Sequence, residues 1–116
     1  MVYSLISLRD KMDTLEKNKR LNDLFAIYQD LLTDKQQLYF NAYYLDDYSL
    51  QEIADLYQVS RNAVHDQLKK TEEHLINYEQ VLKINEQKLK RQAYLDMYFK
   101  TKDEAHLIKI KEMDEN

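Results

Sequence analysis

The chain has 116 residues, with 17 basic and 21 acidic side chains and a net charge of −4, and this length suits one small domain. It contains no Gly, no Pro and no Cys. Tight hairpin turns and phosphate-binding loops rely on glycine, so the composition argues against sandwiches and barrels and excludes the dinucleotide and P-loop fingerprints. Without cysteine there is no disulfide, thiolate metal site or cysteine nucleophile. We therefore predict an all-α fold.

The N-terminal segment is apolar only over residues 2–8 and then runs into Arg9, Asp10 and Lys11. It is too short for a membrane span and lacks the leading basic region of a signal peptide. We therefore expect no membrane span and a cytoplasmic location. We also expect residues 1–12 to form a poorly ordered N-terminal extension.

Capping boxes predict where helices begin, because each sets a short polar acceptor three residues before an acidic or amide side chain. The pairs are Asp13 and Glu16, Thr33 and Gln36, Ser49 and Glu52, and Thr101 and Glu104, with Ser60 as a fifth candidate cap. Apolar residues at helical spacing then predict a first helix that ends near residue 32 and further helices over residues 34–45, 50–57 and 61–70.

Beyond residue 70 the apolar spacing changes to a heptad, which predicts a long helix that runs to about residue 91 and then a short final helix. The apolar stripe along this long helix, the heptad seam, has more surface than a small helical head can cover. We predict that residues 71–116 form a C-terminal extension that pairs with a second copy of the chain. The residues of this predicted dimer interface are Leu75, Tyr78, Leu82 and Leu89. In the alternative, the final helix folds back onto the seam within one chain.

The segment 47–71 has the pattern of a helix-turn-helix unit, which we place at residues 49–70 within a helical head of residues 13–70. Its predicted core residues are Ile53, Ala54, Val59, Val64 and Leu68. Ala54 is small where two helices cross, Val59 plugs the turn, and Val64 and Leu68 hold the second helix. Gln58 stands where such turns usually carry glycine, since that residue tends to a positive φ.

The second helix of this unit would then be a recognition helix, whose N-terminal turns meet base edges in the major groove. The side chains that we predict to contact nucleic acid are Ser60, Arg61, Asn62, His65, Gln67 and Lys69. Arginine and asparagine suit bidentate contacts to guanine and adenine. In the alternative, the unit is only a packing module, because residues 49–70 hold three basic and three acidic side chains.

Residues 31–71, LLTDKQQLYFNAYYLDDYSLQEIADLYQVSRNAVHDQLKKT, together with residues 17–22 and 77–79, resemble the YlxM-type proteins of low-GC bacteria. The similarity covers about residues 14–89. This family is related to region 4 of the sigma factors, so the resemblance implies a sigma-region-4-like helix-turn-helix bundle. Its gene typically accompanies that of the signal recognition particle GTPase, which implies a regulatory role in protein targeting. His65 departs from the family, which commonly has Tyr there.

No grouping of reactive side chains supports an enzyme. His65, His74 and His106 lack a histidine partner at i, i+4, so we expect no metal site, and we predict no catalytic residue and no cofactor. The ten tyrosines would suit a stacking platform, but most fall on predicted inner faces.

We therefore predict a nonenzymatic, DNA-binding helix-turn-helix regulator that acts as a homodimer and, through the resemblance, in the signal recognition particle pathway. RNA is the second candidate polymer. The rival hypothesis is an adaptor that binds the particle's GTPase or RNA, with the helix-turn-helix structural. The net charge of −4 favours this rival, whereas the Ser60-Arg61-Asn62 start of the second helix favours DNA.

Overall fold

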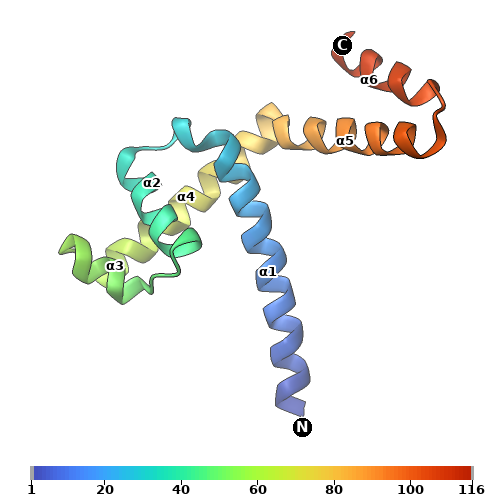
Figure 1. Cartoon of the computed structure of the whole chain (residues 1–116). Helices are drawn as coiled ribbons and strands as arrows, with labels where there is room; N and C mark the ends of the chain where they lie inside the picture. The colour runs from blue at the N-terminus through green and yellow to red at the C-terminus, as the bar shows by residue number, and fades with distance from the viewer. Residues whose placement is uncertain (1, 116) are drawn as a thin grey trace. The chain divides into compact units, whose positions relative to one another are not determined.

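The computed structural model describes the backbone of residues 2–115 and the side chains of residues 13–115, and within this part the fold is all helical, as predicted. Its elements in chain order are α1 (Val2–Tyr28), the 3₁₀ turn η1 (Gln29–Leu31), α2 (Asp34–Phe40), the π-helical turn η2 (Asn41–Leu45), α3 (Leu50–Tyr57), α4 (Arg61–Leu82), α5 (Ile84–Thr101) and α6 (Ala105–Glu115) (Figure 1). The chain divides into two compact units, a head (Met1–Tyr78) and a tail (Glu79–Asn116).

Three of the five predicted helix starts are confirmed. The hydroxyl of Thr33 accepts from the backbone N–H of Gln36 at 3.2 Å, and that of Ser49 accepts from Glu52 at 3.0 Å, with both boxes complete. Ser60 caps α4 by accepting from the N–H of Ala63 at 3.0 Å. Each cap satisfies one of the N–H groups that a helix leaves unpaired at its start.

The other two predicted starts are wrong. Asp13 lies inside α1, because the backbone already runs as a helix from Val2. Thr101 is the last residue of α5, where its hydroxyl donates to the carbonyl of Met97 at 2.9 Å. Asp103 caps α6 instead, since its carboxylate accepts from the N–H of Ala105 at 3.0 Å. The order of residues 1–12 stays a prediction, because their side chains lie outside the described part.

The head has two apolar clusters that meet on α2 and η2. The first joins α1, α2 and α4 through Leu21, Leu24, Phe25, Tyr28, Leu32, Phe40 and Leu75. The second joins α2, η2, α3 and α4 through Tyr39, Ala42, Ile53, Ala54, Val64 and Leu68. Stacking of the Phe25 and Phe40 rings, with centroids 4.2 Å apart, fixes α1 against α2. These clusters hold the start of α4 from one side.

The predicted long helix is interrupted, which corrects the expectation of one helix to about residue 91. Lys83 has a left-handed backbone (φ 54°, ψ 28°) between α4 and α5. The Glu79 carboxylate accepts from the backbone N–H groups of Asn85 at 3.0 Å and Glu86 at 2.9 Å. Glu79 therefore caps α5 and offsets the cost of ending α4 there.

The tail is a helical hairpin, in which α6 folds back beside α5 (Figure 1). Arg91 on α5 pairs with Asp114 on α6. None of the side chains of residues 79–115 is buried, so this hairpin has no core of its own. Among the described residues, no helix is both long and apolar enough to cross a membrane.

Candidate nucleic-acid interface

The turn between α3 and α4 is built as the helix-turn-helix pattern predicts. Ile53, Ala54, Val64 and Leu68 are buried in one cluster, and Val59 packs against its edge. Gln58 takes the left-handed conformation (φ 56°, ψ 48°), and its N–H donates to the carbonyl of Ala54. This bend ends α3, and after a connection of three residues the hydroxyl of Ser60 caps the start of α4.

Most of the side chains that we predict to contact nucleic acid are exposed at the start of α4. The exposed ones are Ser60, Arg61, Asn62, His65 and Lys69. Gln67 is half-buried, and it lies between the buried Val64 and Leu68 rows and the exposed row. It is therefore the least accessible of the six predicted contacts.

The charges on these side chains leave two cations available. Within the described part of the chain, neither Arg61 nor Lys69 takes part in an ion pair, whereas His65 lies 3.7 Å from the carboxylate of Asp66. Both groups of that last pair are exposed. These side chains can thus donate hydrogen bonds to phosphates and base edges. The Asp66 carboxylate repels phosphate and so disfavours purely nonspecific binding.

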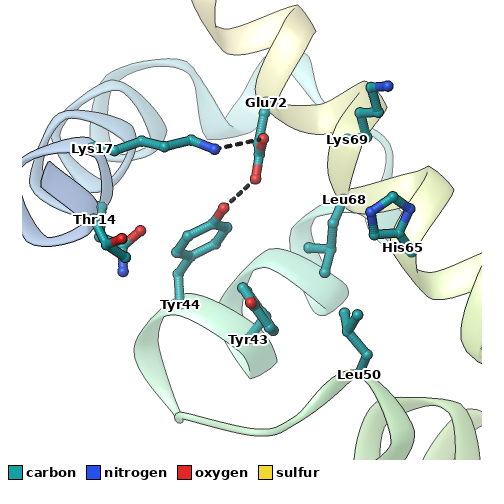
Figure 2. Close-up of a pocket in the computed structure, with 10 residues that line it drawn as sticks. Thr14, Lys17, Tyr43, Tyr44, Leu50, His65, Leu68, Lys69 and Glu72 are labelled. Atoms are coloured by element: carbon teal, nitrogen blue, oxygen red, sulfur yellow. Dashed lines mark hydrogen bonds and ion pairs between the residues drawn. The ribbon is translucent and has the colours of Figure 1, made fainter. Parts of the chain in front are cut away.

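A pocket with a volume of about 440 Å³ opens beside the exposed side chains of α4, between the middle of α1, η2 and α4. Figure 2 shows Lys17 reaching from α1 and Tyr44 from η2 toward the carboxylate of Glu72 on α4. The Tyr44 hydroxyl donates to Glu72, and the Lys17 ammonium lies 3.6 Å from it. Burial, then the hydrogen bond to Glu72, raises the pKa of the Tyr44 phenol far above 10.0.

Sequence patterns did not single out this pocket. Lys17 and Glu72 come from helices far apart in the chain, and the short repeats that predict helices carry no information on which charges meet. The one local signal is the pair Tyr43 and Tyr44, which thickens the apolar arc of the predicted helix over residues 34–45. The π-helical turn at Asn41–Leu45 changes the direction of these two side chains relative to a regular helix.

The four residues of the predicted dimer interface do not form one surface. Leu75 is 0% exposed and belongs to the first cluster of the head, so it contacts its own chain. Tyr78 packs against the same cluster, and its hydroxyl donates to the carbonyl of Leu31 at 3.2 Å. Only Leu82 and Leu89 are exposed, at 50% and 53%. The heptad seam is therefore in part the inner face of α4, which corrects the assignment of Leu75 and Tyr78.

Comparison with known proteins matches residues 15–115 to the family described as "Putative helix-turn-helix protein, YlxM / p13 like". A UPF0122 protein of Oceanobacillus iheyensis is 45% identical over 104 residues, which cover 86% of this chain and 99% of the relative. A UPF0122 protein of Listeria monocytogenes is 48% identical over 100 residues, which cover 86% of each chain. One of an Exiguobacterium species is 52% identical over 82 residues, which cover 71% of this chain and 77% of the relative.

The family description is that of a helix-turn-helix protein and not of an enzyme. The match extends over α3, α4 and the tail hairpin, and the turn at Gln58 has the backbone geometry that such a unit needs. The chain belongs to the YlxM / p13-like family of helix-turn-helix proteins.

Proposed function

We propose that this protein is a nonenzymatic, nucleic-acid-binding regulator that reads duplex DNA with α4. The observation that carries the proposal is the two-sided character of α4 at its start. Val64 and Leu68 fix one side in the head, Asn62, His65 and Lys69 are exposed along another face at i, i+3 and i+7 spacing, and Arg61 is exposed in the first turn. A rigidly held helix with an exposed polar N-terminal turn suits insertion into a major groove.

Each exposed side chain has a chemical role in this mechanism. Arg61 can donate two hydrogen bonds to the O6 and N7 acceptors of guanine, and Asn62 can pair with N6 and N7 of adenine. Lys69, two turns further along, suits a backbone phosphate. The hydroxyl of Ser60 accepts from Ala63, which leaves its hydrogen free to donate to a second phosphate at the helix start.

The resemblance to YlxM-type proteins supports a proposal for the cellular setting. Because the gene of such proteins typically accompanies that of the signal recognition particle GTPase, we propose that this regulator acts in the cytoplasm in protein targeting. RNA of the particle is the second candidate polymer. The rival function, an adaptor of the particle's GTPase, is favoured by the net charge of −4 and by the exposed apolar side chains of the tail, among them Leu89, Phe99 and Ile108.

Fluorescence anisotropy with duplex DNA and with the particle's RNA, repeated over a range of salt concentrations, tests the proposal. Binding should weaken as salt rises, because each neutralised phosphate releases counterions. The double variant Arg61→Ala with Lys69→Ala should lower affinity by about tenfold or more. Lys88→Ala with Lys100→Ala removes the same charge from the tail and is the matched control.

The control should bind nearly as the parent does. If the parent binds neither polymer at low salt, the nucleic-acid proposal is wrong and the adaptor function gains support. Pull-down of the purified GTPase without nucleic acid, unaffected by the Arg61 and Lys69 substitutions, would favour that rival directly.

We also propose that the protein forms a homodimer. Its interface would lie on the tail and would not include Leu75 and Tyr78 of the heptad seam. Leu82 and Leu89 are exposed, and the hairpin has no core of its own. Analytical ultracentrifugation should therefore give a dimer mass for the parent and a monomer mass for Leu82→Asp. An unchanged mass for Leu82→Asp would remove this residue from the interface.

A further inference from the structure

We propose that the pocket between α1, η2 and α4 binds one unpaired nucleotide of the nucleic-acid strand that α4 holds. The inference rests on the proposed function and adds a second kind of recognition to it. Two side chains connect the pocket to the interface, because His65 and Lys69 line the pocket and also belong to the exposed row of α4. A ligand in the pocket therefore lies where a bound strand would pass.

The size of the pocket suits a small polar ligand. Its volume of about 440 Å³ falls within the range of about 300–1,000 Å³ that is typical of ligand sites. Leu50 and Leu68 form apolar parts of the lining, and Thr14 and Asn18 add polar groups from α1. A ligand that is flat and apolar on its faces but polar at its edges matches this mixture, and a nucleobase has that character.

An aromatic surface is available for stacking. Tyr43 is 37% exposed, although it lies in a core-facing turn, and its ring meets that of Tyr44 edge to face with centroids 4.9 Å apart. Tyr43 also lines a second, adjoining hollow of about 300 Å³ together with Tyr48. Unpaired bases stack on exposed tyrosine rings in many single-strand sites, with little dependence on sequence.

Cations flank this aromatic surface on two sides. Lys17 extends from α1 and Lys69 from α4, and His65 lies on the same side as Lys69 (Figure 2). The Lys17 side chain is 62% exposed despite its ion pair, so it can contact Glu72 and a phosphate together. Positive groups on opposite walls could contact the phosphates on either side of one extruded nucleotide.

Glu72 gives the pocket a preference among bases. The Glu72 side chain is 20% exposed; its Oε1 accepts from the Tyr44 hydroxyl, and its Oε2 forms an ion pair with Lys17. A carboxylate has about four acceptor positions, so two remain for donors of the ligand. Guanine, adenine and cytosine offer an amino group at the base edge and thymine does not. We therefore expect guanine to bind better than thymine.

Three duplexes of one sequence test the inference by anisotropy, made both as DNA and as RNA. They are fully paired, bulged at one guanosine, and bulged at one abasic site, which keeps the backbone and the bend but removes the base. The guanosine bulge should bind at least about fivefold more tightly than the abasic bulge, the lower end of what stacking of one base contributes. Tyr43→Leu should bring this ratio close to one.

Two further variants sharpen the result. Tyr94→Leu changes a half-buried tyrosine in the tail, so it is the matched control and should keep the ratio. Glu72→Gln should reduce the preference for a guanosine bulge over a thymidine bulge, because the amide replaces one acceptor with a donor. Unchanged affinity of each variant for the fully paired duplex shows that the head is folded.

The outcomes separate this inference from the proposed function. If the paired duplex binds but the two bulges bind alike, the pocket inference is wrong and the proposed function stands. If no duplex binds, both are wrong. If guanosine monophosphate shifts the amide resonances of Lys17 and Tyr43 while the bulges bind alike, the pocket takes a free nucleotide and the strand form of the inference is overturned.

Discussion

Gln58 holds a left-handed backbone conformation (φ 56°, ψ 48°) that glycine adopts without steric cost. Replacing Gln58 with Gly should therefore stabilise the head by about 0.5–1 kcal/mol, since removal of the strain outweighs the greater freedom of glycine in the unfolded chain. Urea unfolding followed by circular dichroism measures this difference. Recognition should be unaffected, because the residue precedes the exposed face of α4.

The matched control is Gln51→Gly, an exposed position within α3. There the same substitution should destabilise the head by about 1 kcal/mol, because glycine loses more conformational freedom in a helix and the hydrogen bond from Gln51 to Asp55 is removed. A loss of stability in Gln58→Gly would show that the Gln58 side chain contributes more than its backbone strain costs.

Tyr44 links protonation to stability at alkaline pH. Burial and the hydrogen bond to Glu72 raise the pKa of its phenol above 10.0 in the folded head. The unfolded phenol ionises at its ordinary pKa, so the stability from this group is complete below about pH 10 and is lost as the pH rises above it. Tyr44→Phe should cost about 1–2 kcal/mol near neutral pH, and this cost should shrink at about pH 11.

Urea unfolding at both pH values, with Tyr94→Phe as the control, measures this effect. The parent and Tyr44→Phe differ only at this side chain, so the difference between the two proteins isolates Tyr44. A cost that stays constant across the range would mean that folding does not raise the pKa of the Tyr44 phenol.

At the scale of helices, local side-chain chemistry predicted the starts of α2, α3 and α4, because each cap acts within three residues of sequence. The same rule failed at Asp13. The backbone of α1 is already helical before Asp13, so this residue lies inside the helix and does not start it. Capping residues permit a helix start and do not force one.

The break at Lys83 could not be predicted for a related reason. Its stabilising partner is the Glu79 carboxylate, which lies before the break and accepts from two N–H groups after it. No local sequence pattern indicates that arrangement, and the heptad of leucines continues across it. Likewise the recognition face of α4 follows from local spacing, whereas the Lys17, Tyr44 and Glu72 cluster depends on tertiary packing.

The heptad leucines therefore have two different roles, which a pair of substitutions separates. Leu75→Ala removes a side chain that is 0% exposed and should destabilise the head by about 2–5 kcal/mol. Leu82→Ala, at a side chain that is 50% exposed, should change the stability of a monomer by less than about 0.5 kcal/mol. Thermal unfolding at low protein concentration measures both. Equal losses of stability in the two variants would contradict the assignment of Leu75 to the core and of Leu82 to the surface.

For the whole molecule, the two units differ in how their helices are stabilised. Ile53, Val64 and Leu75 have no exposed surface in the head, whereas no described side chain beyond residue 78 is buried. Helices of this length are marginal in water without tertiary packing. The tail is therefore expected to open more readily than the head. A partner that covers the tail would stabilise its helices more than those of the head.

Hydrogen exchange on the full chain tests this difference. At low protein concentration the amides of α5 and α6 should exchange at least about tenfold faster than those around Ile53 and Val64, because local opening requires no loss of buried surface. If a second copy covers Leu82 and Leu89, protection of the tail should rise with protein concentration while that of the head stays constant. Leu82→Asp should abolish this rise. Tail amides that are protected as strongly as the head at every concentration would show that the hairpin is stable alone, and would remove the physical reason for a partner.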